Sequence, residues 1–256
     1  GGGRIVTAQT AYSPEEFLIT TITRLLPEKG NAAVGAASPV PGSAVLLQRE
    51  LTGGALRASL IQGTSNNPFT DGGRELFDAA GQGRIDVFFL GGVQIDGQAN
   101  LNLVGTGEYP NLDRRFPGSF GSAHMYFVVP RVILFRPEHT RRVFVEKVDF
   151  ISAPGVSPPD VYRPGGPHAL VTELCIMSFD RKKGRFRLES VHPGHSVEEV
   201  RDNTGFDFDV PDTVPTTAEP EPERLDVLRS KIGREIAGTY PEFAERVLGF
   251  KAQESA

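Results

Sequence analysis

The chain has 256 residues, with 27 basic and 32 acidic side chains and a formal net charge of −5, and this length suits one large α/β domain or two small ones. The acidic excess argues against binding to bulk nucleic acid, which requires a basic surface. The single cysteine, Cys175, excludes an internal disulfide and a cysteine-rich zinc site, and no run of about 20 apolar residues predicts a membrane span.

Residues 1–12 are expected to form a flexible lead. They begin with three glycines and contain no apolar segment of the signal-peptide type. Together with the single cysteine, which suits a reducing compartment, this favours a cytoplasmic location.

The first predicted helix runs from Ser13 to about Leu26. Ser13 is a suitable N-cap, Pro14 suits the first helical position, and two glutamates follow in the first turn. Pro27 ends the helix. Further along the chain we predict a strand at 32–35, a helix at 42–51 that stops at two glycines, and a strand at 56–61.

The most informative stretch is FFLGGVQIDGQANLN at residues 88–102, followed by FPGSFGSA at 116–123. The near-continuous apolar run at 86–90 is typical of a strand buried on both faces of a parallel sheet. Two glycines, an amide-rich segment and a second glycine loop at 118–121 follow this strand. Glycine loops admit a ligand close to the main chain, and their free N–H groups can hold an oxyanion.

The rest of the chain is richer in strand patterns. We predict helices at 74–80, 196–201, 224–236 and 241–250, and strands at 126–129, 132–135, 142–150, 169–178 and 185–190. The order of elements indicates an α/β fold with an open, mostly parallel sheet flanked by helices and extended by antiparallel strands. The expected organisation is one domain at 13–210, a Pro- and Glu-rich tether at 211–223, and a helical segment at 224–256 that packs on the domain.

Other polar segments permit more than one interpretation. QGTSNN at 62–67 follows a strand, and it is either a plain polar loop or the lining of a carbonyl or thioester pocket. His192 and His195 flank a Pro-Gly turn, but no third ligand accompanies them, so no metal site is predicted. Cys175 lies in an apolar run and is interpreted as a small buried hydrophobe.

Six segments, taken in order, resemble the β-subunit of class I (glutaconate-type) CoA-transferases over roughly residues 13–236. The segment that ends in NTGFDFDV is the most specific of them. The segments are VGAASPVPGSA (34–44), FFLGGVQIDGQANLN (88–102), RRFPGSFGSA (114–123), RRVFVEKVDFISAPG (141–155), ALVTELCIMSFD (169–180) and HPGHSVEEVRDNTGFDFDV (192–210).

The resemblance implies an open α/β fold and a homologous α-subunit as partner, in an αβ or α2β2 complex. It implies an active site at the subunit interface that takes an acyl-CoA, with coenzyme A as part of the substrate and no tightly bound cofactor. In the transferases, a β-subunit glutamate attacks the thioester from a turn after the strand that corresponds to residues 56–61. A carboxylate suits this step because it is a nucleophile without prior proton transfer.

The chain departs from the family at this turn, because Gln62-Gly63-Thr64 replaces the Glu-Ser-Gly-like sequence. Members without the glutamate resemble ring-cleaving hydrolases of steroid catabolism or decarboxylases of unsaturated dicarboxylyl-CoAs. The resemblance therefore implies carbon–carbon bond hydrolysis or a lyase step, with the base supplied by the α-subunit. Two alternatives stay open: a true CoA-transferase that uses another carboxylate, and a non-catalytic scaffold for an active α-subunit.

The same resemblance assigns roles to individual residues. Gln62 is expected to contact the substrate at the position of the family glutamate. The other candidates are main-chain donors at Gly118, Ser119 and Gly121, the pocket floor at Gly35 and Ser38, and the substrate pocket at Asn66, Gln94 and Asn100.

Overall fold

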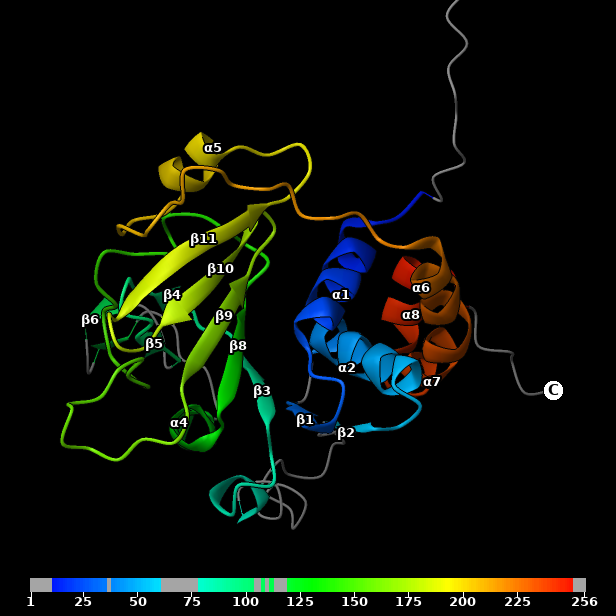
Figure 1. Cartoon of the computed structure of the whole chain (residues 1–256), viewed down its shortest axis with the longest axis horizontal. Helices are drawn as coiled ribbons and strands as arrows, with labels where there is room; N and C mark the ends of the chain where they lie inside the picture. The colour runs from blue at the N-terminus through cyan, green and yellow to red at the C-terminus, as the bar shows by residue number, and fades with distance from the viewer. Residues whose placement is uncertain are drawn as a thin grey trace, which may run out of the picture.

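A computed structural model describes residues 11–35, 38–60, 78–103, 107–108, 111–112 and 119–250, with the backbone alone at 107–108, 111–112 and 119–120. Its centre is a seven-stranded sheet in the order β11-β10-β9-β8-β3-β1-β2 (Figure 1). The strands are β1 Gly30–Val34, β2 Leu56–Leu60, β3 Val87–Leu90, β8 Arg131–Phe135, β9 Pro167–Val171, β10 Cys175–Asp180 and β11 Arg185–Val191.

The sheet combines a parallel part with an antiparallel edge. Strands β2, β1, β3, β8 and β9 are parallel neighbours. Strands β10 and β11 continue the sheet in antiparallel pairing. This arrangement confirms the predicted fold class. Two small antiparallel pairs lie outside the main sheet: β4 Gln94–Ile95 with β5 Leu101–Asn102, and β6 Gly107–Glu108 with β7 Asn111–Leu112.

The helices begin and end largely where local signals predicted. At α1 (Pro14–Leu25), the Ser13 side chain accepts the Glu16 N–H at 3.1 Å, and the Glu16 carboxylate accepts the Ser13 N–H at 3.0 Å. This reciprocal capping box confirms the predicted start. The remaining helices are α2 Pro39–Leu51, α4 Ser119–Val128, α5 Val197–Asp202, α6 Pro222–Val227, the π-helical turn η1 Leu228–Ile232, α7 Gly233–Thr239 and α8 Pro241–Leu248.

Three predicted strands were wrong. Residues 126–129 belong to the end of α4, because a short apolar run does not distinguish a strand from a buried helix. Residues 142–150 form an irregular segment with one isolated bridge, between Phe144 and Ile95. The predicted strand at 169–178 is two strands, since the Thr172 hydroxyl accepts the N–H groups of Leu174 and Cys175 and turns the chain.

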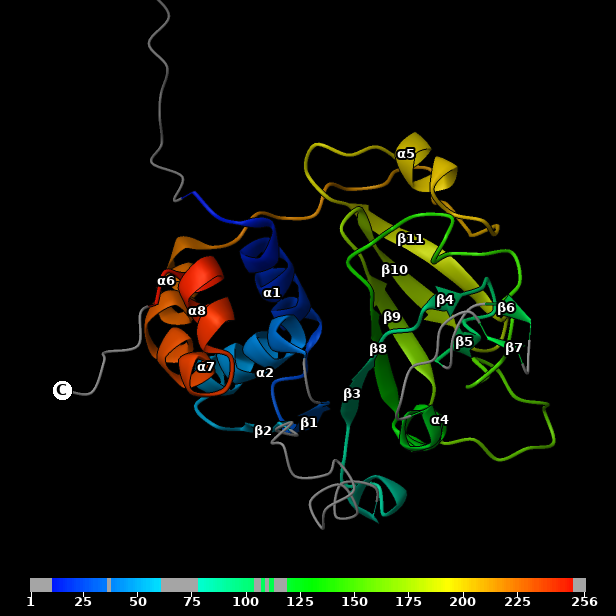
Figure 2. The same cartoon turned by 180° about the vertical axis from the view of Figure 1, so that it is seen from behind.

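Two hydrophobic clusters lie on opposite faces of the sheet. Alternation along β3 sends Val87 and Phe89 to one cluster and Phe88 and Leu90 to the other. The first cluster is covered by α1, α2, η1, α7 and α8, and the second contains apolar residues of the β4–β5 hairpin and of α4. Figures 1 and 2 show α1, α2, α6, α7 and α8 gathered on one side, and the β4–β5 hairpin on the other side with α4 and α5.

The C-terminal helices are tied to the N-terminal helix. α6, η1 and α7 follow one another without a break, so the helix predicted at 224–236 is confirmed and is longer than predicted. Arg229 donates to the buried Glu16 carboxylate at 2.6 Å and 3.0 Å. None of the helices in the described ranges has the length and apolar character needed to span a bilayer.

Candidate functional site

The carboxyl ends of the parallel strands form the edge at which open α/β sheets bind their ligands. From β1 the chain crosses through α2 to β2 on one side, whereas β3 pairs with β1 on the other side. This reversal of strand order places a topological switch point between β1 and β3. The segments that follow these two strands therefore border the expected crevice, and we take this edge as the candidate site.

Two of the predicted floor residues lie at this edge. Gly35 directly follows β1, and no described atom lies within 4 Å of the position that a Cβ would occupy there. Ser38 is the N-cap residue of α2. The space beside Gly35 is compatible with the predicted floor of a pocket, and the roles of both residues stay predictions.

The glycine pair after β3 has a packing role. A Cβ at Gly91 would lie 2.8 Å from the Phe135 carbonyl oxygen, and one at Gly92 would lie 3.0 Å from that of Gln94. These positions therefore require glycine because the chain approaches its own backbone. The turn brings the end of β3 against the end of β8 and starts the β4–β5 hairpin.

Gln94 is engaged within the chain. Its Oε1 accepts the Asn102 side-chain amide at 3.0 Å and the Asp149 backbone N–H at 2.9 Å, and its Nε2 donates to the Asp149 carboxylate at 3.2 Å. The side chain is 7% exposed. A substrate contact by Gln94, as predicted, would compete with these three bonds.

Asn100 is held in a similar way at the tip of the same hairpin. Its Nδ2 donates to Asp96 at 3.1 Å, and its Oδ1 accepts the Gly155 N–H at 3.1 Å. The neighbouring Ala99 has a positive φ of 58°, and its carbonyl accepts the Tyr126 hydroxyl at 2.7 Å. The predicted pocket residues Gln94 and Asn100 thus stabilise a rigid hairpin beside the switch point, and their contact with a substrate is still only predicted.

The second glycine loop is partly helical. Ser119 and Gly121 lie in the first turn of α4. First-turn N–H groups have no acceptor within their own helix, so a helical start still provides main-chain donors of the predicted kind. The predicted residues Gln62, Asn66 and Gly118 lie outside the residues that the structure describes.

Sequence reasoning missed a buried histidine pair beyond the end of β9. His139 contacts the hydroxyls of Thr172 and Thr204, both at 2.7 Å. His192 contacts the Thr217 hydroxyl at 2.8 Å and the Thr172 carbonyl oxygen at 2.8 Å. Burial lowers the pKa of each histidine to about 4, so both rings are neutral near pH 7.

His192 and His195, which flank the Pro-Gly turn at 193–194, have different partners within the described residues. His195 contacts the Glu199 carboxylate at 2.8 Å, and no group of His, Cys, Asp and Glu in that part of the chain could hold a metal ion. Cys175 is fully buried, and burial raises the pKa of its thiol to about 12, so the thiol is not a nucleophile at neutral pH.

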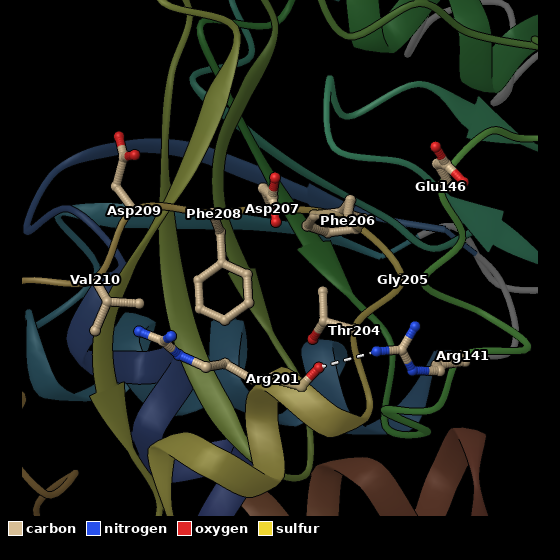
Figure 3. A pocket seen from close by; sticks show the side chains of 10 residues that line it. All are labelled: Arg141, Glu146, Arg201, Thr204, Gly205, Phe206, Asp207, Phe208, Asp209 and Val210. Carbon is tan, nitrogen blue, oxygen red and sulfur yellow. Dashed lines mark hydrogen bonds between the residues drawn. The ribbon is translucent and has the colours of Figure 1, made fainter.

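A cavity of about 720 Å³ lies beside β11, the outer strand of the sheet on the side away from β1 and β2 (Figure 3). Residues 204–210 run beside β11 there, and Arg141 donates to the carbonyl oxygen of Asp202 at 2.6 Å at the end of α5. Both charge signs line the cavity, which points to no single ligand class. Its lining residues are Arg141, Glu146, Arg201, Thr204, Gly205, Phe206, Asp207, Phe208, Asp209 and Val210.

Sequence comparison links most of the chain to characterised proteins. Residues 16–203 match the family model described as Coenzyme A transferase. The chain is 35% identical over 161 residues to the B-type subunit of the 3-oxoadipate CoA-transferase of Pseudomonas knackmussii, a match that covers 60% of this chain and 62% of that protein. It is 28% identical over 237 residues to the cholesterol ring-cleaving hydrolase IpdB subunit of Rhodococcus jostii, covering 90% of this chain and 85% of that subunit.

Structural comparison agrees with these matches. The crystal structure of Rhodococcus jostii IpdAB superposes with a TM-score of 0.74 at 25% sequence identity, over 86% of this chain and 94% of that chain. The match to the 3-oxoadipate CoA-transferase subunit spans less than two thirds of that relative, and the match to the Rhodococcus jostii hydrolase subunit spans most of both chains.

Proposed function

The chain belongs to the coenzyme A transferase family, and from this premise we propose that it is the B-type subunit of a heteromeric enzyme that cleaves a carbon–carbon bond in an acyl-CoA. The observation that carries the proposal is Gln62, which stands where the resemblance places the family's nucleophilic glutamate. A glutamine amide is a poor nucleophile and does not form the acyl anhydride on which CoA transfer depends.

The proposed reaction is hydrolysis of a β-keto acyl-CoA. Water adds to the ketone carbonyl, and the bond from that carbonyl carbon to the α-carbon breaks. The electron pair passes to the α-carbon and into the thioester carbonyl as an enolate, and protonation of the α-carbon then gives the acyl-CoA product. The ketone carbon becomes a carboxylate, and its extra oxygen comes from water.

This chain would supply the electrostatic part of the site. The main-chain N–H groups of Gly118, Ser119 and Gly121 would donate to the enolate oxygen, and the start of α4 at Ser119 supports donors at this position. Gly35 and Ser38 would shape the floor, with Gln62 and Asn66 as polar contacts. The base that activates water would come from the homologous partner subunit.

The match to the Rhodococcus jostii hydrolase subunit, which aligns with 90% of the chain at 28% identity, supports hydrolysis. One observation favours CoA transfer instead. The transferase subunit has the higher identity, 35%, although over only 60% of the chain. The two reactions differ in a way that can be measured, since only transfer forms a glutamyl-CoA thioester on the protein.

The test uses the chain purified with its partner subunit and 2-oxocyclohexanecarbonyl-CoA as the probe. In H₂¹⁸O we expect pimelyl-CoA with one ¹⁸O in the new carboxylate, measured by mass spectrometry. Borohydride treatment during turnover should leave both subunits unmodified. A reduced glutamyl adduct on either subunit, formed with a carboxylic acid acceptor present, would instead establish CoA transfer.

A substitution at Gln62 tests whether this chain takes part in the reaction. Gln62→Ala should lower kcat about tenfold, because loss of one substrate hydrogen bond of this kind is worth roughly 1–1.5 kcal/mol. The matched control is Gln82→Ala, which removes an exposed glutamine in a turn. Equal turnover of both variants would favour a non-catalytic scaffold role for the chain.

A further inference from the structure

Arg136 has an unusual position at the carboxyl edge of the sheet. It directly follows β8, and its backbone N–H donates to the Val171 carbonyl oxygen at 3.1 Å, which continues the pairing with β9. Its Nε is buried and has no hydrogen-bond partner in the part of the chain that the structure describes. Within the same residues, the guanidinium forms no ion pair.

The position lies beside the candidate site. Leu134 of β8 is the partner of Leu90 in β3, so Arg136 is level with the Gly91-Gly92 turn. The close approach of Gly91 to the Phe135 carbonyl oxygen confirms that the two chain segments touch there. Alternation along an extended strand places Arg136 on the face of Leu134, which the β4–β5 hairpin covers.

Glu138, a carboxylate on which the charge of Arg136 acts, already has other partners. The pKa of Glu138 is lowered mainly by its hydrogen bond with Arg142, then by Thr140, and the charge of Arg136 adds a smaller contribution. The Glu138 oxygens therefore have other partners, although Arg136 is near enough to act on them. A buried donor without a partner destabilises a fold. A bound anion would remove this cost.

We propose that Arg136 binds an oxyanion of the acyl-CoA substrate, either a carboxylate on the acyl group or a phosphate of coenzyme A. The proposal rests on the function proposed above. A guanidinium presents several N–H donors in one plane and matches both anions with paired, charge-assisted hydrogen bonds. The Nε of Arg136, which has no partner within the described residues, then donates a hydrogen bond to the oxyanion of the ligand.

The test compares Arg136→Gln with Arg131→Gln in the chain purified with its partner subunit. Arg131 is an exposed arginine at the other end of β8, so both variants lose one positive charge from the same strand. Affinities for CoA, pentanoyl-CoA and glutaryl-CoA are measured by calorimetry. Arg136→Gln should weaken binding about 10- to 100-fold, whereas Arg131→Gln should not. Arg136→Lys, which keeps the charge but not the planar donors, should recover part of the affinity.

The pattern across the three ligands identifies the anion. Loss for glutaryl-CoA alone indicates the acyl carboxylate, and equal loss for all three indicates a phosphate. The melting temperature of the unliganded Arg136→Gln complex should be unchanged or higher, because an unpaired donor is removed. If Arg136→Gln binds all three ligands with unchanged affinity, the role of Arg136 is overturned, whatever its melting temperature, while the proposed function stands. Wild-type complex that binds none of the three ligands overturns both.

Discussion

Lowering the pH from 6.5 to 4.5 should destabilise the folded chain by several kcal/mol. The cause is the pair His139 and His192, which are 1% and 3% exposed and whose rings are hydrogen-bonded as neutral groups. Burial lowers the pKa of both to about 4 from an ordinary value of 6.5. When the pH is below both values, a shift from 6.5 to about 4 lowers the free energy of unfolding by roughly 3 kcal/mol for each histidine.

The sign follows from proton uptake. Between pH 6.5 and pH 4 the unfolded chain binds protons at these histidines and the folded chain does not. Acid therefore favours unfolding, so stability is complete above pH 6.5 and falls as the pH approaches 4. The charge of His192 also disfavours protonation of His139, which adds to the lowering of the pKa of His139.

Urea unfolding followed by circular dichroism at pH 7.0, 6.0, 5.0 and 4.5 measures the effect. His139→Gln replaces the ring with a neutral amide and should remove about half of the pH dependence in this window. His195→Gln is the control, because that ring lies outside the buried pair and contacts Glu199. Equal unfolding free energies at pH 7.0 and pH 5.0 would contradict the assignment.

Gly155→Ala should destabilise the chain by about 3 kcal/mol or more, by overpacking against backbone. A Cβ at Gly155 would lie 2.1 Å from the Gln98 carbonyl oxygen and 2.6 Å from that of Ala99. These atoms have little freedom to move, because the Ala99 carbonyl oxygen accepts the Tyr126 hydroxyl and the Gly155 N–H donates to the Asn100 side chain. The added methyl group must therefore displace the β4–β5 hairpin.

Thermal and urea unfolding measure this loss. The matched control is Gly238→Ala in α7, where no described atom lies within 4 Å of the new Cβ. That variant should gain about 0.5–1 kcal/mol from the better helix propensity of alanine. Because the hairpin borders the candidate site, Gly155→Ala should also weaken acyl-CoA binding at temperatures where the variant is folded. A Gly155→Ala variant as stable as wild type would show that the hairpin is not fixed by this contact.

Local signals predicted the elements whose physics is local. The Ser13 N-cap and the glycine stop after α2 each depend on residues close in sequence, and both are present in the structure. Apolar runs were less informative. The run at 126–129 is helical, and the run at 169–178 is broken by the Thr172 hydroxyl, so hydrophobicity alone did not determine the backbone conformation.

The candidate site was only partly predictable, because its polar residues bond to segments that are far away in the sequence. Gln94 and Asn100 were predicted at a ligand pocket, and that role stays a prediction. Their amides, however, bond to Asp149 and Gly155, which are 55 residues away in each case. Arg136 carried no motif, and its unpaired Nε became evident only when its surroundings were known.

The sequence by itself determined the family, the mostly parallel sheet and the absence of a carboxylate at position 62, because each depends on the order of residues along the chain. Tertiary structure alone decided which polar groups are paired with one another and which have no hydrogen-bond partner within the described residues. The partners of His139 lie in two distant segments, at Thr172-Glu173 and at Thr204. Packing of the whole fold brings such groups within hydrogen-bond distance, and no local pattern encodes that proximity.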